Sequence, residues 1–257
     1  AEAGVGAPAG GDAAAGAAQS EPVERRVKLG GYDCIALGRE DCLDGRQAPD
    51  LAVVILHGFG ATNKDFVDVP AVARDLAAAR DVVWIFPQAE PGDMGASAWW
   101  SIDPMKWMTA AMSGGDQLAQ LIREQPPGLD ECRRRMVTLL DELEAMIGGL
   151  PTSRVALGGF SQGAITAMDT ALHLPADRTV AGVAMLSGAP IVVEQWAERL
   201  KVHEGLRTFV THGSADMVLP FAASGWLKQL LEAGGADVRY EVHGGGHTLA
   251  PDTIPKV

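Results

Sequence analysis

Short apolar runs alternate along the chain with longer amphipathic segments. The short runs have the length of buried β-strands, and the longer segments repeat apolar residues at spacings of three and four, which is typical of helices. The predicted strands are 26–37 (interrupted at Gly30-Gly31), 51–56, 82–86, 154–158, 180–186, 208–211 and 238–242. The predicted helices are 65–79, 129–147, 161–172, 193–202 and 220–233. This alternation predicts the α/β fold class, with a mostly parallel central sheet and helices on both faces.

The first 22 residues differ from the rest in composition. They are mostly Ala, Gly and Pro without an aromatic residue, and such a segment cannot bury enough apolar surface to order itself. We expect a disordered tail over 1–22 and a single domain over 23–257. The chain opens on Ala rather than Met, as it would if an upstream segment had been removed. The compartment stays open between bacterial cytoplasm and, if the tail followed an export signal, the periplasm.

Charge and hydropathy exclude some classes of partner. The chain carries 33 acidic and 21 basic residues, a formal net charge of −12. A surface this acidic repels a phosphate backbone, so we expect no nucleic acid partner. No run of about 18 consecutive apolar residues occurs, so no membrane span is predicted. The run Arg133-Arg134-Arg135 is interpreted as a solvated helix face without a partner.

The three cysteines are Cys34, Cys42 and Cys132. None lies in a Cys-x-x-Cys or Cys/His spacing of the kind that binds zinc, so no metal site is predicted. Cys34 and Cys42 fall in the first β-like region and could pair across a hairpin in an oxidising compartment. Free buried thiols are the commoner outcome, and we expect no disulfide.

The segment at about 88–128 is a connection of about 40 residues, far longer than the usual loop. It concentrates large apolar side chains, namely Met94, Trp99, Trp100, Met105, Trp107, Met108 and Met112. Any single one of these aromatic residues is more often a core residue, but long excursions of this kind commonly form lids over a site. We therefore expect a substrate-facing role for the segment. The candidate pocket residues are Trp99, Trp100, Trp107, Met217 and Val218.

The run Gly159-Phe160-Ser161-Gln162-Gly163 lies between a predicted strand and a predicted helix. Glycine two positions before and after a serine permits a sharp strand-to-helix turn, because it removes β-carbons that would clash. Such a turn exposes the serine hydroxyl, and unpaired N–H groups at the start of the helix point toward it. Ser161 is therefore the candidate nucleophile.

A serine hydroxyl is a poor nucleophile near neutral pH, so it needs a base within hydrogen-bond reach and a carboxylate that orients the base. His247 follows the last predicted strand in a glycine run, and Asp216 follows the strand 208–211. Both lie at carboxyl ends of strands, where open α/β sheets place their sites. The order serine, aspartate, histidine along the chain favours this set.

Other residues compete for these roles. The other histidines that end strands are His57, His212 and His243, which could be structural hydrogen-bond partners. Asp169 lies on the helix after the serine and Asp237 precedes the last strand, so neither reaches easily behind the proposed base.

A tetrahedral oxyanion needs two convergent backbone donors. One candidate is the N–H of Gln162, next to the nucleophile. The other is the N–H of Phe59, in the loop His57-Gly58-Phe59-Gly60 after an earlier strand. A plain glycine turn is the alternative interpretation of that loop.

Five blocks of the chain resemble the phospholipase/carboxylesterase family of α/β-hydrolases, which includes acyl-protein thioesterases and small bacterial carboxylesterases. They are LHGFG at 56–60, FPQA at 86–89, WWSID at 99–103, LGGFSQGA at 157–164, and HGSAD at 212–216 with GHT at 246–248. The resemblance spans about 26–248, and its GGFSQG block is the most specific. It implies an α/β-hydrolase fold and an esterase without a cofactor, acting on carboxylic esters or thioesters through an acyl-enzyme. The implied triad is Ser161, Asp216 and His247, and the implied oxyanion donors are Phe59 and Gln162.

Two features depart from the family pattern. The segment 106–128 is longer than in small family members, and the chain stops at Val257 where the family usually continues into a terminal helix. We expect that this helix is absent or that the chain is truncated.

The function predicted from these residues is a serine carboxylesterase for a small-molecule ester with an apolar acyl or aromatic group. Alternatives with the same fold are a feruloyl or polyester esterase, a lipase and a peptidase. An alternative of another class is a non-catalytic binding protein, which usually lacks one triad residue. The natural substrate, the preference for ester or thioester and the oligomeric state stay open.

Overall fold

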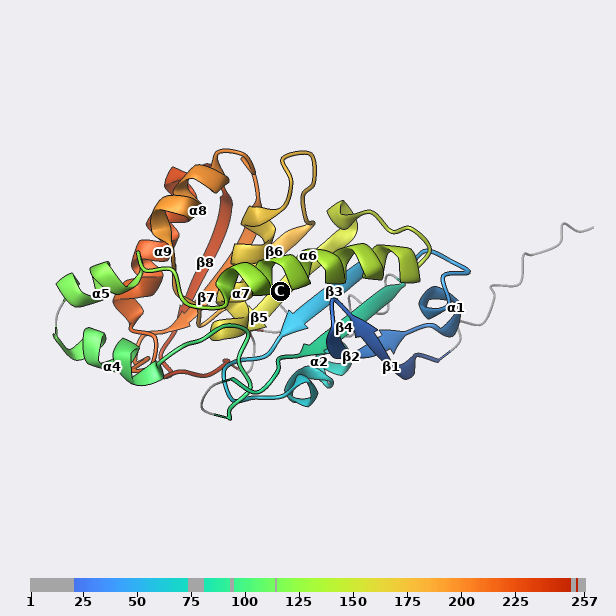
Figure 1. Ribbon diagram of the computed structural model, residues 1–257, viewed down its shortest axis with the longest axis horizontal. Coiled ribbons are helices and arrows are strands. Elements are labelled where there is room, and N and C mark those ends of the chain that lie inside the picture. The colour runs from blue at the N-terminus through green and yellow to red at the C-terminus, as the bar shows by residue number, and fades with distance from the viewer. Residues whose placement is uncertain (1–20, 74–80, 93–94, 114, 251–252, 254–257) are drawn as a thin grey trace, which may run out of the picture.

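An eight-stranded sheet forms the centre of the molecule (Figure 1). The computed structural model describes residues 21–73, 81–92, 95–113, 115–250 and 253. Within these, the strands are β1 (Val23–Leu29), β2 (Tyr32–Gly38), β3 (Leu51–Leu56), β4 (Val82–Gln88), β5 (Val155–Phe160), β6 (Gly182–Leu186), β7 (Arg207–Gly213) and β8 (Asp237–His243). Their order is β1-β2-β4-β3-β5-β6-β7-β8. The first two strands form an antiparallel hairpin, β2 runs antiparallel to β4, and all other pairs are parallel.

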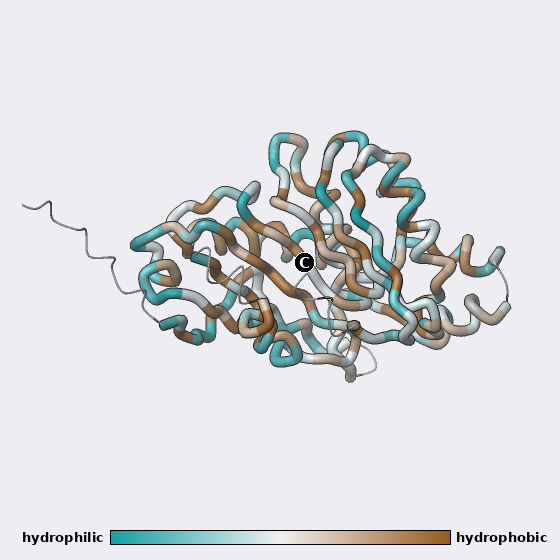
Figure 2. The backbone as a smooth tube through the Cα atoms, turned by 180° about the vertical axis from the view of Figure 1, so that it is seen from behind, coloured by the Kyte–Doolittle hydropathy of each residue, from teal (hydrophilic) through white to brown (hydrophobic). Residues whose placement is uncertain are grey.

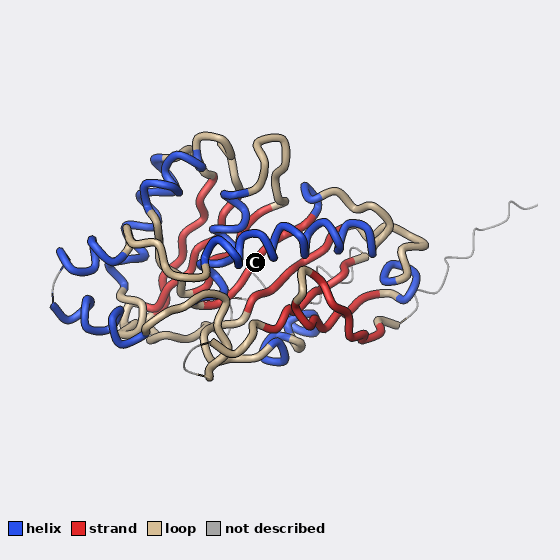
Figure 3. Tube along the Cα trace, in the orientation of Figure 1, coloured by secondary structure: helices blue, strands red, loops and turns tan. Residues whose placement is uncertain are grey.

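Helices connect the parallel strands (Figure 3). The α-helices of the described residues are α1 (Glu40–Leu43), α2 (Val69–Val72), α4 (Pro104–Ser113), α5 (Gly115–Leu121), α6 (Leu129–Met146), α7 (Gln162–His173), α8 (Val193–Leu200) and α9 (Phe221–Ala233). Two 3₁₀ turns, η1 (Asn63–Phe66) and η2 (Thr152–Arg154), precede α2 and β5. The predicted α/β architecture with a mostly parallel sheet is therefore confirmed.

The strand predictions agree with the structure, with one refinement. The run 26–37 is a complete hairpin that turns at Gly30 and Gly31, whose φ angles of 57° and 77° suit glycine. Four predicted helices are confirmed as α6, α7, α8 and α9. Within the predicted helix 65–79, only Val69–Val72 form an α-helix (α2), residues 65 and 66 belong to the 3₁₀ turn η1, and the residues from 74 to 79 lie outside the described ranges. Most of the predicted tail over 1–22 also lies outside them.

The long segment at 88–128 is more ordered than a loop prediction implies. It contains α4 and α5, which pack against each other. Trp99, Trp100 and Trp107 are all buried in the main core cluster. The carbonyl of Ile122, just after α5, accepts a hydrogen bond of 3.2 Å from the N–H of Val193. These contacts attach the excursion to the domain rather than leave it free over the surface.

Alternation along the central strands divides the core between the two faces of the sheet. On β3, Val54 and Leu56 join the larger cluster, which holds the buried sides of α6, α7, α8 and α9. Val53 and Ile55 point to the other face and join a smaller cluster with Phe66 of η1. Because both faces are apolar, β3 is a continuous run of hydrophobic residues, and brown stretches cross the centre of the molecule in Figure 2.

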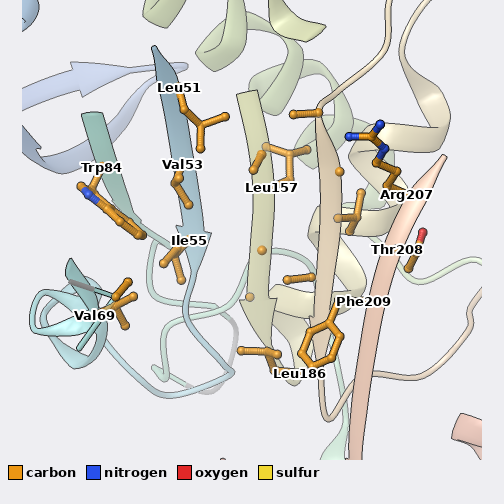
Figure 4. Close-up of a pocket in the computed structure, with 18 of the residues that line it drawn as sticks. Leu51, Val53, Ile55, Val69, Trp84, Leu157, Leu186, Arg207, Thr208 and Phe209 are labelled. Atoms are coloured by element: carbon orange, nitrogen blue, oxygen red, sulfur yellow. The ribbon is translucent and has the colours of Figure 1, made fainter. Parts of the chain in front are cut away.

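The smaller cluster borders an apolar trough of about 710 Å³ along the sheet (Figure 4). Its lining includes Leu51, Val53, Trp84, Leu157, Leu186 and Phe209. Ser161, Asp216 and His247 are not among the lining residues, although Gly159 is. We therefore do not assign the trough to the candidate chemistry, which lies beyond the carboxyl ends of the strands.

The interpretation of Arg133-Arg134-Arg135 as one solvated face is wrong for two of the three residues. Arg133 binds the buried Asp169 carboxylate through two nitrogens, at 2.7 and 2.9 Å. The guanidinium of Arg135 lies 3.8 Å from the centre of the Tyr32 ring. Only Arg134 is exposed, and it pairs along the helix with Glu131. Successive helix positions face different directions, so a run of like residues does not share one face.

Candidate active site

Ser161 occupies a strained turn between β5 and α7. Its φ of 55° and ψ of −122° are rare for a residue with a side chain. The turn is tight because glycine stands on both sides: a β-carbon on Gly163 would lie 2.1 Å from the Leu56 carbonyl oxygen, and one on Gly159 would lie 2.5 Å from the Gly163 carbonyl carbon. The Ser161 N–H donates to the Leu186 carbonyl at 2.9 Å, which ties the turn to the end of β6. The close packing and this hydrogen bond therefore keep Ser161 in its strained conformation at the edge of the sheet.

The structure brings together the three residues of the expected triad. His247 Nε2 lies 2.8 Å from Ser161 Oγ, and His247 Nδ1 lies 2.7 Å from Asp216 Oδ2. The carboxylate can only accept, so Nδ1 carries the hydrogen and Nε2 is left to accept the serine proton. The imidazole also packs against the Phe160 ring, with centroids 4.8 Å apart. This is the geometry of a nucleophile, a base and an orienting carboxylate.

Asp216 is held as an anion inside the protein. Burial alone would raise the pKa of its carboxyl, but hydrogen bonds from His212, from His247 and from the Val218 N–H outweigh burial and hold that pKa well below its usual range. Asp216 Oδ1 accepts the N–H groups of Val218 and Leu219, both at 2.9 Å. A charged carboxylate in this position can stabilise a protonated imidazole.

Close packing between two loops places His247 beside Asp216. A β-carbon on Gly213, at the end of β7, would lie 2.2 Å from the Gly246 carbonyl oxygen and 2.4 Å from that of Gly245. The N–H of Ala215 donates to the Gly245 carbonyl at 3.0 Å. The loop that carries His247 therefore lies directly on the end of β7, and this contact requires the absence of a side chain at position 213.

The loop that carries one proposed oxyanion donor, Phe59, packs against the nucleophile turn. Gly58 lies against the nucleophile, since a β-carbon there would be 3.4 Å from Ser161 Cβ. In the described part of the chain, no acceptor is recorded for the backbone N–H of Phe59 or of Gln162. Gln162 is the first residue of α7, where backbone donors lack helical partners. Backbone donors without a partner, one next to the serine and one in the loop that packs against it, are the kind of group that stabilises a tetrahedral oxyanion.

A buried network links these two donors, and sequence reasoning missed it. The Gln162 side chain accepts the Trp99 N–H at 3.2 Å and donates to the Trp100 carbonyl at 2.7 Å. The Trp99 indole N–H donates to the His57 carbonyl at 2.8 Å, in the loop that carries Phe59. The blocks WWSID and GGFSQG are both visible in the sequence, but the hydrogen bonds between them depend on the packed fold.

The candidate pocket residues have different environments. Trp99, Trp100 and Trp107 are buried in the core, and the Trp100 indole N–H donates to Thr166 Oγ1 at 3.0 Å. Met217 is 64% exposed directly after Asp216, and Val218 is half-buried. The two tryptophans at 99 and 100 thus brace the site, while Met217 offers an apolar surface beside it. A contact of any of the five with substrate stays a prediction.

The competing histidines and aspartates have other partners. The Ala89 N–H donates to His57 Nε2 at 3.1 Å, so His57 Nδ1 carries the hydrogen that bonds to the Gly58 carbonyl at 2.7 Å. Burial lowers the pKa of His57, which suits this neutral structural role. Asp169 binds Arg133 and Trp196, and Asp237 begins β8 in an exposed position. His212 is different, because it contacts the Asp216 carboxylate.

Three further findings concern the cysteines, possible metal ligands and long apolar helices of the described residues. Cys34, Cys42 and Cys132 are buried and free. The described residues contain no group of three or more His, Cys, Asp and Glu side chains that could hold a metal ion. No helix within the described ranges combines the length and the apolar character that crossing a membrane requires.

Comparison with known proteins gives a family match over most of the chain. The family model for Phospholipase/Carboxylesterase matches residues 40–257. An acyl-protein thioesterase 1 from Gibberella zeae is 24% identical over 209 residues, covering 80% of this chain and 86% of the relative. The acyl-protein thioesterase 1 from Eremothecium gossypii is 25% identical over 219 residues, covering 81% and 85%.

Solved structures show the same fold. The esterase PE8 superposes with a TM-score of 0.67 at 23% identity, covering 92% of this chain and 96% of the other. A carboxylesterase from Mesorhizobium loti superposes with a TM-score of 0.64 at 17% identity, covering 90% and 94%. The fold of the chain is thus the α/β-hydrolase fold, as the sequence predicted.

Proposed function

Because the chain belongs to the phospholipase/carboxylesterase family of ester and thioester hydrolases, we propose that it is a serine carboxylesterase that forms an acyl-enzyme on Ser161. The observation that carries this proposal is the relay from Ser161 Oγ through His247 to Asp216, with steps of 2.8 and 2.7 Å. A binding protein on the same fold has no need of a complete relay at a strained serine, so this alternative is less well supported.

In the proposed reaction, His247 Nε2 takes the proton of Ser161 as Oγ attacks the ester carbonyl carbon. The N–H groups of Phe59 and Gln162 stabilise the oxyanion, and Asp216 stabilises the imidazolium. His247 then donates its proton to the leaving alcohol, which departs and leaves the acyl group on Ser161. Water attacks this acyl-enzyme by the same route and releases the acid.

The acyl group is proposed to be apolar or aromatic. The support is the exposed side chain of Met217, next to the triad aspartate, and that of Phe221, which is 39% exposed at the start of α9. A thioester is the second candidate substrate, favoured by the relatives named acyl-protein thioesterase 1. Both substrates would pass through the same acyl-enzyme, since the attacked carbon is an acyl carbon in each.

The decisive experiment compares Ser161→Ala with the wild type on p-nitrophenyl esters. Loss of the nucleophile should lower kcat by about five to six orders of magnitude and leave the melting temperature nearly unchanged. The matched control is Ser214→Ala, an exposed serine on the adjacent loop, which should retain full activity. Turnover by Ser161→Ala at the wild-type rate would eliminate the proposal.

Two further assays separate the alternatives. A fluorophosphonate probe should label the wild type rapidly and Ser161→Ala not at all, because only an activated serine reacts fast; a binding protein would not be labelled. A panel of short-chain, long-chain and feruloyl esters, with an acyl thioester beside them, then ranks the substrate classes by kcat/KM.

A further inference from the structure

The Asp216 carboxylate touches a second imidazole besides that of the proposed base. His212 Nε2 lies 3.3 Å from Asp216 Oδ2, the same oxygen that accepts from His247 Nδ1 at 2.7 Å. The side chains of His212 and Asp216 are both completely buried, with 0% exposure. One fully buried carboxylate oxygen is therefore shared by two histidines.

Hydrogen bonding identifies the tautomer of His212. Its Nε2 lies 2.8 Å from the Leu219 carbonyl oxygen as well as near Asp216. Carbonyl and carboxylate oxygens only accept, so Nε2 carries a hydrogen that is directed to Leu219 and shared with Asp216. His212 Nδ1 is buried and, within the described residues, has no hydrogen-bond partner. A proton there would be buried without an acceptor, which is costly, so the ring is the neutral Nε2–H form.

The same contacts close the loop between β7 and α9. His212, near the end of β7, binds the carbonyl of Leu219 just before α9. Asp216, midway between them, binds the N–H groups of Val218 and Leu219 through Oδ1. The carboxylate is thus held from one side by two amides and from the other by two imidazoles, and a rotation of its plane would break several of these bonds together.

We propose that His212 is a positioning residue of the reaction: it holds the Asp216 carboxylate so that Oδ2 faces His247, and it draws off part of the negative charge of that oxygen. This role rests on the proposed function. The first effect keeps the His247 ring aligned with Ser161. The second weakens the hold of Asp216 on a protonated His247, so loss of the His212 donor strengthens that hold.

The test replaces His212 by residues that do or do not offer a donor. His212→Leu removes the N–H at similar size, while His212→Gln places an amide N–H near the position of Nε2. The matched control is His203→Leu, because His203 is also buried but lies beside Arg199, away from the triad. All variants are compared by melting temperature, by kcat and kcat/KM for a p-nitrophenyl ester across pH, and by the low-field proton resonance of the His247–Asp216 hydrogen bond.

We expect His212→Leu to lose roughly ten- to a hundred-fold in kcat, the effect of losing a hydrogen bond to a charged group, and the acid limb of its pH profile to move to higher pH. His212→Gln should recover most of the wild-type kcat, and the acid limb of its pH profile should lie at the wild-type pH. His203→Leu should match the wild type in kcat and in the acid limb of the pH profile. The low-field resonance should shift in His212→Leu alone, a readout that needs no substrate.

Several outcomes would overturn the proposal. A His212→Leu enzyme with the kcat, acid limb and low-field resonance of the wild type excludes the positioning role, and the proposed function survives as long as Ser161→Ala is inactive. Turnover by Ser161→Ala would remove both. Should His212→Leu not fold, His212→Asn, whose amide is one methylene shorter than that of Gln, takes its place. If His212→Asn and His212→Gln then had equal kcat values and equal acid limbs of the pH profile, the positioning role of His212 would be refuted.

Discussion

Substitution of Gly213 by alanine tests whether contact between two loops sets the position of the proposed base. A β-carbon at this position would lie 2.2 Å from the Gly246 carbonyl oxygen, whereas carbon and oxygen in contact normally lie about 3.3 Å apart. One of the two segments must therefore move by about 1 Å. Gly213 is paired with His243 at the end of the β7–β8 ladder, so the loop that carries His247 is the segment that gives way.

A displacement of this size matters because the proton transfer depends on a 2.8 Å contact between His247 and Ser161. A misplacement of about 1 Å can reduce the rate on the order of a hundred-fold. We expect Gly213→Ala to lower kcat/KM for a p-nitrophenyl ester by about this factor and to slow labelling by a fluorophosphonate probe in parallel. The melting temperature should fall by only a few degrees, since the contact lies at the edge of the sheet.

The control for this experiment is Gly244→Ala, in the same loop. A β-carbon at Gly244 meets nothing within 4 Å, so the variant changes the flexibility of the loop without pushing on it and should keep wild-type activity. If Gly213→Ala retained kcat/KM within threefold of the wild type, the claim that this contact positions His247 would be refuted.

Two further predictions concern stability. Arg133→Met should lower the free energy of unfolding by about 3–5 kcal/mol, because it leaves the buried Asp169 carboxylate without its cation. Arg134→Met, which removes an exposed pair with Glu131, should change that free energy by less than about 1 kcal/mol. Urea titration measures both values, and equal effects would contradict the different environments of the two arginines. The pKa of Asp216 is lower in the folded protein than in the unfolded chain, so its contribution to stability is complete above about pH 4 and declines as pH falls through the folded pKa. The difference in unfolding free energy between wild type and Asp216→Asn should therefore shrink as pH falls below about pH 4, and a difference that grew over that acid range would show that the sign is wrong.

The sheet and its edge could be predicted because each signal is local. Strands buried on both faces are apolar runs, and the runs at 51–56 and 155–157 stand out for that reason. Parallel strands end at one edge, so the loops that follow β5, β7 and β8 had to meet there. The approach of His247 to Ser161 then required only that the glycine-rich loop fold back onto the sheet.

The functions of individual side chains within the packed fold were harder to predict. Trp99 and Trp100 were expected to face substrate because they lie in a long connection, yet their indole N–H groups bind His57 and Thr166 inside the core. His212 was regarded as a structural partner, but its position relative to Asp216 depends on the turn of the loop 213–219. The hydrogen-bond partners of these side chains depend on tertiary packing, and the hydrophobic periodicity of the sequence does not predict that packing.

The network around Gln162 connects the buried tryptophans to the proposed chemistry. The backbone N–H of Gln162 is one of the two proposed oxyanion donors, and the Gln162 side chain accepts a hydrogen bond from the Trp99 backbone. Trp99 in turn holds the carbonyl of His57, two residues before the other donor, Phe59. The two donors are therefore joined through buried hydrogen bonds, and their separation is set before substrate arrives. An oxyanion hole fixed in this way needs no reorganisation at the moment of reaction, which is the condition under which backbone donors stabilise a transition state most strongly.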